Sequence, residues 1–364
     1  MPIYMDRHDV SEAVTAELIA QLHQADLKVQ DQFGCRGLTY WFDDKRKTAF
    51  CLIEAADSQA IHDMHKQAHG EVPHSVIEVD PNIVESFLGR IEDPEKAKDT
   101  KLNIINDPAF RTIMVIALSP LTPKGNGTPH RSPSNDYSDR VLEVLNSHDG
   151  SLVKQTGDQF LASFKSVSKA VDAALEIQAK LKKDKHDNVL VKIGLAAGSP
   201  VTKKQLIFED TIKLAERMCK IIKGEIIVSS EVKDLYKSEN SNAFVKGRNV
   251  STLTRDDEQF LNHFSDFIES TWTNANLKVD DFSKPMGSSK SQLYRRITFL
   301  AGKSLNAIVK EYRLSEALKL LNKRSGNISE IAFETGFTSP SYFCKCFQKR
   351  YGYSPSDYLP TPAE

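Results

Sequence analysis

The sequence predicts a multidomain α+β protein in which two α+β modules precede an all-helical domain. Three observations lead to this prediction. The length of 364 residues is enough for two or three domains, each with a core of its own. Strand-like and helix-like periodicities alternate through roughly the first 240 residues, whereas only helical spacing follows. The charge is also uneven, because residues 284–350 contain 13 Lys and Arg but 4 Asp and Glu, in a chain of net charge −1.

The first module alternates between strand and helix patterns in a recognisable order. Strand patterns lie at residues 2–8, 38–42, 48–53 and 75–79, and helical patterns lie at 11–29 and 58–69. The resulting order βαββαβ is that of a ferredoxin-like unit of about ninety residues. We expect this domain to occupy residues 1–86. A charged linker is expected at 87–110, where Pro94 would end any helix arriving from upstream, with packing of the segment on a neighbouring domain as the alternative.

Histidines are concentrated in and after the second predicted helix. His65 and His69 are one helical turn apart, and imidazoles at that spacing can chelate a borderline metal such as nickel or zinc. The other candidate ligands are His74 and His8, with Asp6 and Cys35 as alternatives. A plain histidine-rich helix surface would give the same pattern. The domain resembles a family of small ferredoxin-like proteins described as nickel-binding, and this resemblance implies a metal-binding role.

The second module begins with a buried type of strand and continues with alternating elements. Strands are expected at residues 112–118, 189–195 and 225–229, with a hairpin at 152–164 that turns at Gly157-Asp158. Helices are expected at 137–146, 166–181 and 210–222. A loop rich in Pro, Gly and Ser covers 119–135. We expect this module to span residues 111–237, followed by a polar linker at 238–256.

Two motifs in this module carry a resemblance to class III nucleotide cyclases over about residues 110–236. They are the Lys-x-x-Gly-Asp-x-Phe turn that contains Asp158 and the Ile-Gly-Leu-x-x-Gly run at 193–198. The resemblance implies two metal-binding aspartates, of which Asp158 matches the second, while Ala117 stands at the position of the first. It also implies an asparagine and an arginine on a late helix, where this chain has Lys213 and Arg217.

Loss of a metal-binding carboxylate removes several kcal/mol of charge stabilisation in a two-metal mechanism. We therefore predict that the module is not an enzyme and that it binds a ligand or dimerises. A simple spacer is the alternative, and a divergent nucleotide cyclase is the rival reading.

The run from Asn327 to Gly352 predicts a helix, a glycine turn and a second helix. Ile328, Ile331 and Ala332 have helical spacing, and Gly336 supplies a residue that can adopt positive φ and end the helix. Ser339-Pro340 is typical of a helix start. Phe343, Phe347 and Tyr351 would then face inward, leaving a basic, hydroxyl-bearing outer face. A helix-turn-helix of this kind can enter a major groove, whereas a helical hairpin with a solvated face is the alternative.

A related pattern occurs upstream, at residues 277–300. A short helix ends near Gly287, and Pro285 is expected to shorten it. Leu293, Ile297 and Leu300 mark the inner face of the following helix. One longer amphipathic helix at 304–321 joins the two units.

Two such units joined by one helix resemble the DNA-binding domain of AraC-type transcription regulators, over about residues 257–359. The resemblance implies a DNA-binding transcription regulator with double-stranded DNA as its partner, and RNA polymerase is a further expected partner. A homodimer is expected because class III cyclases pair two such domains and a regulator that reads two DNA sites gains from a symmetric partner. The residues expected to face DNA are Ser288, Ser289, Lys290, Gln292, Arg295, Arg296, Ser339, Ser341, Tyr342, Lys345, Lys349 and Arg350. Residues near the helix starts are placed for base edges, and Lys349 and Arg350 for phosphates.

The remaining features point to a reduced, cytoplasmic compartment without a membrane partner. The five cysteines are scattered or separated by one residue, without the paired spacing of zinc sites. The chain shows no signal-peptide pattern and no apolar run of membrane length. A metal-storage or metal-sensing protein is a further alternative, because of the histidines in the first module.

Overall fold

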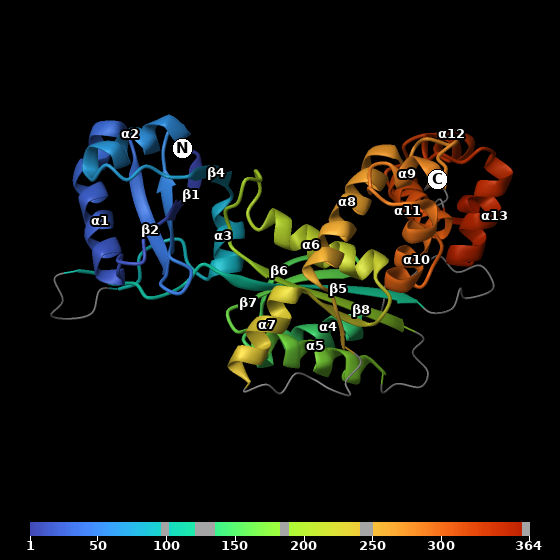
Figure 1. Cartoon of the computed structure of the whole chain (residues 1–364), viewed down its shortest axis with the longest axis horizontal. Coiled ribbons are helices and arrows are strands. Elements are labelled where there is room, and N and C mark those ends of the chain that lie inside the picture. Colours follow the sequence, from blue (N-terminus) through green and yellow to red (C-terminus); the bar gives the residue numbers. More distant parts are fainter. Residues whose placement is uncertain (96–101, 121–134, 183–188, 241–249, 359–364) are drawn as a thin grey trace, which may run out of the picture.

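The computed structural model describes residues 1–95, 102–120, 135–182, 189–240 and 250–358. It confirms the predicted multidomain α+β class. Two modules with βαββαβ sheets are followed by a helical region, in the order left to right in Figure 1. Most of the loop expected at 119–135 and part of the polar linker expected at 238–256 lie outside the described residues.

The first module is a four-stranded sheet with strand order β2-β3-β1-β4, the order of a ferredoxin-like unit. Its elements are β1 (Ile3–Asp9), α1 (Ala16–Val29), a short 3₁₀ helix (Gln30–Phe33), β2 (Arg36–Asp43), β3 (Thr48–Glu54), α2 (Ser58–Ala68), β4 (Ser75–Val79) and α3 (Pro81–Leu88). α1 begins later than the expected residue 11, because Thr15 caps it by accepting a hydrogen bond from the Leu18 backbone N–H.

The strands of this sheet bury both of their faces. Tyr40, Phe42 and Ile53 point toward α1 and α2, where they join one hydrophobic cluster. Trp41 and Leu52, which alternate with them, belong to a second cluster on the opposite face. That second face is therefore available for packing against the rest of the chain.

The segment expected as a linker at residues 87–110 is not a free linker in the part that the structure describes, and the alternative of packing on a neighbouring domain holds there. Residue 86 lies inside α3, and the segment that follows packs on the first module. The Arg90 guanidinium lies 4.3 Å from the Trp41 ring centroid and donates a hydrogen bond to the Tyr40 carbonyl. Ile105 is buried, and its backbone N–H donates to the Tyr40 hydroxyl. Sequence periodicity does not reveal this packing, because the residues that it joins lie far apart along the chain.

The second module contains a six-stranded sheet with the order β10-β9-β8-β5-β7-β6. Its elements are β5 (Arg111–Pro120), α4 (Asn135–Ser147), β6 (Ser151–Thr156), β7 (Gln159–Phe164), α5 (Val167–Lys182), β8 (Val189–Gly198), α6 (Glu209–Ile221), β9 (Ile226–Val228), α7 (Ser230–Glu239) and β10 (Val250–Thr252). β6 and β7 are joined by a two-residue turn at Gly157-Asp158, as predicted. The expected boundaries at 237 and 256 fall inside α7 and the next helix, and β10 belongs to the sheet.

The two faces of this sheet carry different cores. Met114, Ile116 and Leu118 of β5 pack with α4, α5 and α7. On the other face, Val115 and Ala196 share a cluster with α6 and with helices of the C-terminal region. The strand therefore packs within its own module on one side and against the helical domain on the other.

The helical region begins at α8 and forms two helix pairs around one long helix. Its elements are α8 (Arg255–Thr271), α9 (Val279–Ser283), α10 (Lys290–Ala301), α11 (Leu305–Asn322), α12 (Ile328–Glu334), α13 (Pro340–Tyr351) and α14 (Pro355–Tyr358). The first pair packs in the cluster shared with the second module, whereas the second pair has a separate core around Phe343 and Phe347. Within the described part of the chain, no helix has both the length and the apolar character needed to cross a bilayer.

Candidate functional site

The first helix-turn-helix unit consists of α9, a turn at Gly287 and α10. Gly287 has φ of +57°, a conformation that favours glycine. The Ser289 side chain accepts a hydrogen bond from the Gln292 backbone N–H, and the Gln292 side chain accepts one from the Ser289 N–H. Two residues expected at the DNA surface therefore also form the capping box that starts α10.

The basic residues of this unit differ in their surroundings. Lys290 is exposed and pairs with Asp280 at 2.6 Å. Arg296 is drawn back onto α8, where it forms ion pairs with Asp256 and Asp257 and lies 4.3 Å from the Phe260 ring centroid. The expectation that Arg296 faces DNA is therefore wrong for this structure, because internal partners hold its side chain. Its neighbour Arg295 is exposed.

The second unit consists of α12, a turn at Gly336 and α13. Gly336 has φ of +77°, and Ser339 caps α13 by accepting a hydrogen bond from the Tyr342 backbone N–H. Phe343 and Phe347 are fully buried, as their spacing predicted. This geometry places the start of α13 at the outer surface of the domain.

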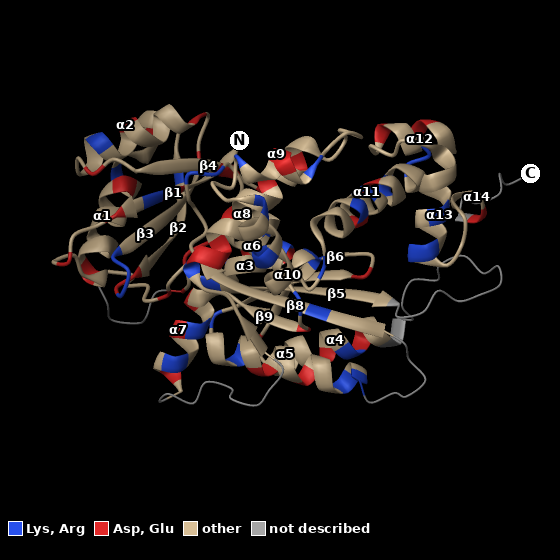
Figure 2. Cartoon of the chain, turned by 45° about the vertical axis from the view of Figure 1, so that its right-hand side comes forward, with Lys and Arg blue, Asp and Glu red and all other residues tan. Residues whose placement is uncertain are grey.

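The outer face of α13 keeps the expected hydroxyl and basic groups. Ser341, Tyr342 and Lys345 are exposed near its start, and Lys349 and Arg350 are exposed near its end. The two basic residues give the blue ribbon at the end of α13 in Figure 2. Ser288 and Ser339 are half-buried at the two turns. Among the described residues, no ion pair involves Arg295, Lys345 or Lys349.

A cluster of imidazole and carboxylate groups lies inside the first module. His65, on α2, is 1% exposed, and its Nε2 lies 2.9 Å from Asp6 and its Nδ1 3.0 Å from Asp26. His69 Nε2 lies 3.1 Å from Asp26 as well, and His8 Nε2 lies 3.4 Å from Asp6. Elements far apart in sequence, β1, α1 and α2, therefore bring these groups together.

The charges in this cluster are strongly coupled. Burial would lower the pKa of His65, but hydrogen bonds with Asp26 and Asp6, together with their charges, raise its pKa to about 10. Burial acts to raise the pKa of Asp6, but His8 and His65 hold it well below its usual range. The pKa of Asp26 is lowered against the effect of burial by His65 and His69. The arrangement is an imidazolium held between two carboxylates.

Two groups in the cluster have donor atoms close enough to share a metal ion. One is Asp26, His65 and His69, and the other is Asp6, His8, Cys51 and His65. Imidazole and carboxylate donors fit nickel or zinc, so the residues present suit a borderline metal. All of these residues except Asp6 line a cavity of about 320 Å³ whose other walls include Leu18, Ile19 and Tyr40.

Not all of the histidines predicted from sequence belong to this set. His74 lines the cavity but lies outside both groups, and its Nδ1 accepts a hydrogen bond from the Asp9 backbone N–H. Cys35 is buried elsewhere, with its thiol directed to the Phe33 carbonyl. Asp26 was not among the ligands predicted from sequence, although it follows Ile19 by seven residues and His23 by three and so lies on the buried face of α1.

The positions matched to nucleotide cyclases lie together in the second module but do not form a complete site. Ala117 is opposite Gln159 in the β5–β7 register, and the Leu118 backbone N–H donates to the Asp158 carbonyl. Asp158 is thus adjacent to the position without a carboxylate. On α6, Lys213 pairs with Glu209 at 2.6 Å.

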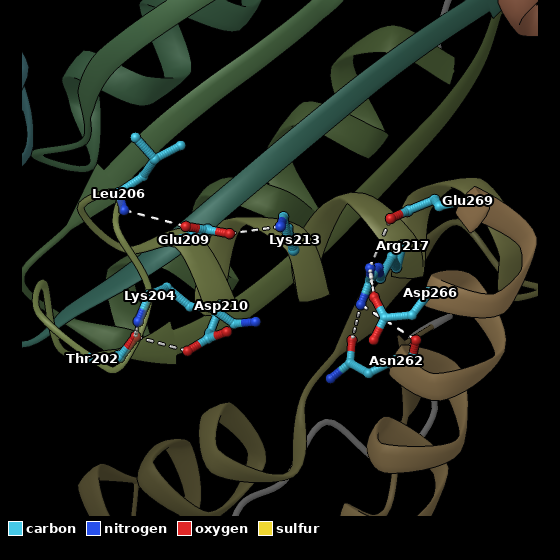
Figure 3. Close-up of polar contacts among 10 residues, drawn as sticks. All are labelled: Thr202, Lys204, Leu206, Glu209, Asp210, Lys213, Arg217, Asn262, Asp266 and Glu269. Carbon is cyan, nitrogen blue, oxygen red and sulfur yellow. Dashed lines mark hydrogen bonds and ion pairs between the residues drawn. The ribbon is translucent and has the colours of Figure 1, made fainter.

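Arg217, also on α6, points to the helical domain rather than to Asp158. Its guanidinium donates to Asn262 at 2.9 Å and to Asp266, and it pairs with Glu269 at 3.1 Å, as Figure 3 shows. The side chain is 8% exposed, so this face of α6 is covered by α8.

Comparisons with known proteins identify the two ends of the chain. Residues 4–79 match the family "Nickel responsive protein SCO4226-like", and residues 282–360 match a helix-turn-helix domain family. The chain is similar to histidine kinase P4 of Formosa agariphila, with 35% identity over 34% of this chain and 9% of the relative. It is also similar to an uncharacterized HTH-type transcriptional regulator of Pseudoalteromonas carrageenovora, with 32% identity over 26% of this chain and 55% of the relative.

Among solved structures, SCO4226 of Streptomyces coelicolor A3(2) is similar to the chain, with 30% identity and a TM-score of 0.20. The similar region covers 21% of this chain and 94% of that protein. The chain thus spans only part of the length of the two curated relatives named above.

Proposed function

We propose that this chain, which carries an AraC-type helix-turn-helix domain at its C-terminus, is a sequence-specific DNA-binding transcription regulator. The observation that carries the proposal is the pair of helix-turn-helix units, α9–α10 and α12–α13, joined by α11. The match of residues 282–360 to a helix-turn-helix family and the names of the curated relatives support it. The two modules ahead of the domain would serve sensing or dimerisation.

Each recognition helix divides its outer residues between two tasks. Side chains near the helix start, such as Gln292 on α10 and Ser341 and Tyr342 on α13, are placed for base edges. Lys349 and Arg350, at the end of α13, are placed for phosphates. We expect α10 and α13 to enter successive major grooves about 34 Å apart.

The test is binding of the full chain to a selected operator and to random DNA over a salt series. Lys349→Ala should weaken binding to both DNAs and reduce the salt slope by about one unit. Gln292→Ala should cost about 1–3 kcal/mol on the operator alone. Gln292→Glu tests the capping box separately, because glutamate preserves it but removes the amide donor and adds a negative charge that should weaken binding to both DNAs.

The outcomes distinguish the two tasks. If Gln292→Ala weakens both DNAs equally, α10 does not read sequence. If no variant differs from the parent protein, the helix-turn-helix assignment is wrong.

We further propose that the second module does not act as a nucleotide cyclase. Ala117 offers no metal ligand, and Arg217 is engaged by three residues of α8. The full chain incubated with ATP or GTP and a divalent metal should form no cyclic nucleotide. Detection of that product would favour the rival proposal of a divergent cyclase.

A second candidate function, metal sensing, is favoured by the buried cluster and by the match to a nickel-responsive family. Asp26, His65 and His69 would hold nickel or zinc, which would crosslink α1 to α2. In titration calorimetry with nickel chloride, His69→Ala should weaken binding, whereas His74→Ala is the matched control outside the cluster. Equal affinity in the parent and both variants would retire this site.

The proposed regulator acts as a homodimer that also contacts RNA polymerase. A symmetric dimer would present its DNA-binding domains to two related sites, and we assign dimerisation to the second module. Sedimentation of the full chain as a monomer at every concentration would contradict this assignment.

A further inference from the structure

Helix α6 contacts both neighbours of its own module. Its first contact lies at Phe208, the residue that caps its N-terminus. Phe208 is fully buried, and its ring centroid is 4.9 Å from that of Phe87 at the end of α3. It belongs to the cluster that contains Met5 and Trp41 of the first module. The N-terminus of α6 is therefore part of the interface between the first two modules.

The backbone of Phe208 shows that this contact is tightly constrained. Its φ is +55°, in the left-handed region that bulky residues rarely adopt. Such a conformation is strained for a bulky residue and persists where the surroundings enforce it. Here the Phe208 backbone N–H donates to the Pro200 carbonyl at 2.8 Å, and the ring is enclosed by the shared core. A shift of the first module would therefore act on the start of α6.

The body of α6 lies unusually close to β8. A Cβ atom on Gly194 would lie 2.4 Å from the Ala215 carbonyl oxygen, and one on Gly198 would lie 2.2 Å from the Thr211 hydroxyl. Glycine at both positions permits this approach. Packing at this distance leaves the helix little room to bend between its two ends, so we expect it to move as a unit with β8.

The other end of α6 holds the helical domain. Arg217 is engaged by Asn262, Asp266 and Glu269, which are spaced along one face of α8 (Figure 3). After the helix, the Lys223 backbone N–H donates to the Leu300 carbonyl of α10 at 2.8 Å. The segment therefore contacts the support helix and the first recognition helix of the proposed DNA-binding domain.

Strand β1 links the candidate sensing cluster to the same interface. Asp6 and His8 point into the cluster of imidazoles and carboxylates, whereas Met5, on the opposite face, packs in the core that encloses Phe208. Adjacent residues of one strand thus face the cluster and the start of the helix. A shift of β1 caused by a change in the imidazole–carboxylate cluster would therefore also displace Met5 in the core around Phe208.

We propose that α6 is the mechanical connector between the first module and the DNA-binding domain, with Arg217 as the positioning residue that holds α8. This proposal rests on the function proposed above and specifies how it is regulated. A displacement of the first module shifts Phe208 and with it α6, and α6 in turn shifts α8 through Arg217. It reaches α10 without any chemistry in the second module.

The test is hydrogen exchange of the full chain, read separately for α6, α8 and α10. Phe87→Leu loosens the ring contact at Phe208 without changing α6 itself, and exchange in α8 should rise several-fold. Arg217→Gln should raise exchange in α8 as well. In the double variant the effects should not add, because the second change interrupts the route used by the first.

Ile177→Val is the matched control, because Ile177 belongs to the core on the opposite face of the same sheet. It removes one methylene group from the module without touching α6, so exchange in α8 should stay at the parent level. The connector is wrong if Phe87→Leu raises exchange in the first module and leaves α8 unchanged. It is equally wrong if Ile177→Val affects α8 as strongly as Phe87→Leu, or if the effects of the two connector variants simply add.

Nickel chloride provides an independent arm. Where calorimetry shows binding, nickel should change α8 exchange in the parent protein and not in Arg217→Gln, at equal nickel affinity. An equal response in both proteins would overturn the connector. Absence of nickel binding would refute the metal proposal alone, because the exchange comparison of the variants needs no metal.

Discussion

Arg295 and Arg296 are neighbours on one helix, yet the structure gives them different roles. Arg295 projects from the exposed face of α10, whereas Arg296 is held by Asp256, Asp257 and the Phe260 ring. A basic face predicted from helical spacing therefore contains one residue available for DNA and one that fixes α8 to α10.

This difference predicts opposite phenotypes. Arg296→Ala should lower the free energy of unfolding by about 1–2 kcal/mol, because it removes ion pairs and a cation–π contact. Arg295→Ala should change stability by no more than about 0.5 kcal/mol but weaken DNA binding. Urea denaturation and binding titrations check both. Loss of DNA affinity in Arg296→Ala at unchanged stability would show that Arg296 contacts DNA, as its position on the helix first suggested.

His65 gives a prediction about pH. Its pKa in the folded state, about 10, lies above its ordinary value of 6.5. The charged form therefore stabilises the fold fully below about pH 6.5, and this contribution is lost as pH rises toward 10. Chelator-treated parent protein should lose a few kcal/mol of stability over that interval.

His65→Gln should show a shallower decline in stability over the same pH range, since glutamine has no proton to lose. Parallel denaturation series at several pH values measure the two slopes. Identical slopes would show that His65 does not gain its proton affinity from Asp6 and Asp26.

At the scale of elements, the two turn glycines form a natural comparison. Both Gly287 and Gly336 have positive φ, but a Cβ on Gly287 would meet nothing within 4 Å. On Gly336 it would lie 2.7 Å from the Trp272 carbonyl oxygen and 2.9 Å from that of Thr273. The second turn therefore needs glycine for space as well as for conformation.

Gly336→Ala should accordingly destabilise the second unit more than Gly287→Ala destabilises the first. The left-handed conformation alone costs about 1–2 kcal/mol, and the clash with two backbone carbonyls adds to it at Gly336. Circular dichroism melts of the two full-chain variants test the order. Equal losses would mean that the backbone at 272–273 yields readily.

Sequence patterns predicted the elements that local chemistry determines. Ser339 and Pro340 start α13, and Phe343 and Phe347 mark the buried face of that helix. Gly336 forms the turn between α12 and α13. Each of these signals lies within a few residues of the feature it predicts. The hairpin of β6 and β7 was predicted for the same reason, because Gly157-Asp158 forms its turn directly between the two strands.

The rest depended on contacts between distant residues. Asp6, Asp26 and His65 come from three elements, so only the fold shows that they meet. Arg217 and Arg296 acquire partners on α8, which helical spacing within α6 or α10 does not reveal. The resemblance to cyclases identified Arg217 but gave no indication that a neighbouring domain would cover it.

At the scale of the whole molecule, the modules share cores instead of being joined by free linkers. One cluster unites the first module with Ile113, Ile207 and Phe208 of the second, and another unites the second with α8 and α10. Arg111, buried between the first two modules, donates hydrogen bonds to the carbonyls of Phe87 and Leu88 at the end of α3.

This architecture predicts how the first module behaves when excised. A fragment ending at residue 86 lacks Phe87 and Leu88, which are buried, and loses the contact of Arg90 with Trp41. It should be less stable than a fragment ending at residue 110 by several kcal/mol. Urea denaturation of the two fragments compares them, and equal stability would mean that the 87–110 segment contributes nothing to the fold.

The core shared by β5, β8, α6, α8 and α10 also limits how this chain can be rebuilt. A chimera that joined residues 255–358 to a foreign receptor would leave Phe264, Leu261 and Ile297 without the partners that now cover them. The transplanted fragment would expose an apolar surface and tend to aggregate. The part of the chain left behind would in turn expose Val115 and Ala196. Productive grafts of this regulator should therefore be made upstream of β5, so that the sheet, α6 and the helical domain are transplanted together.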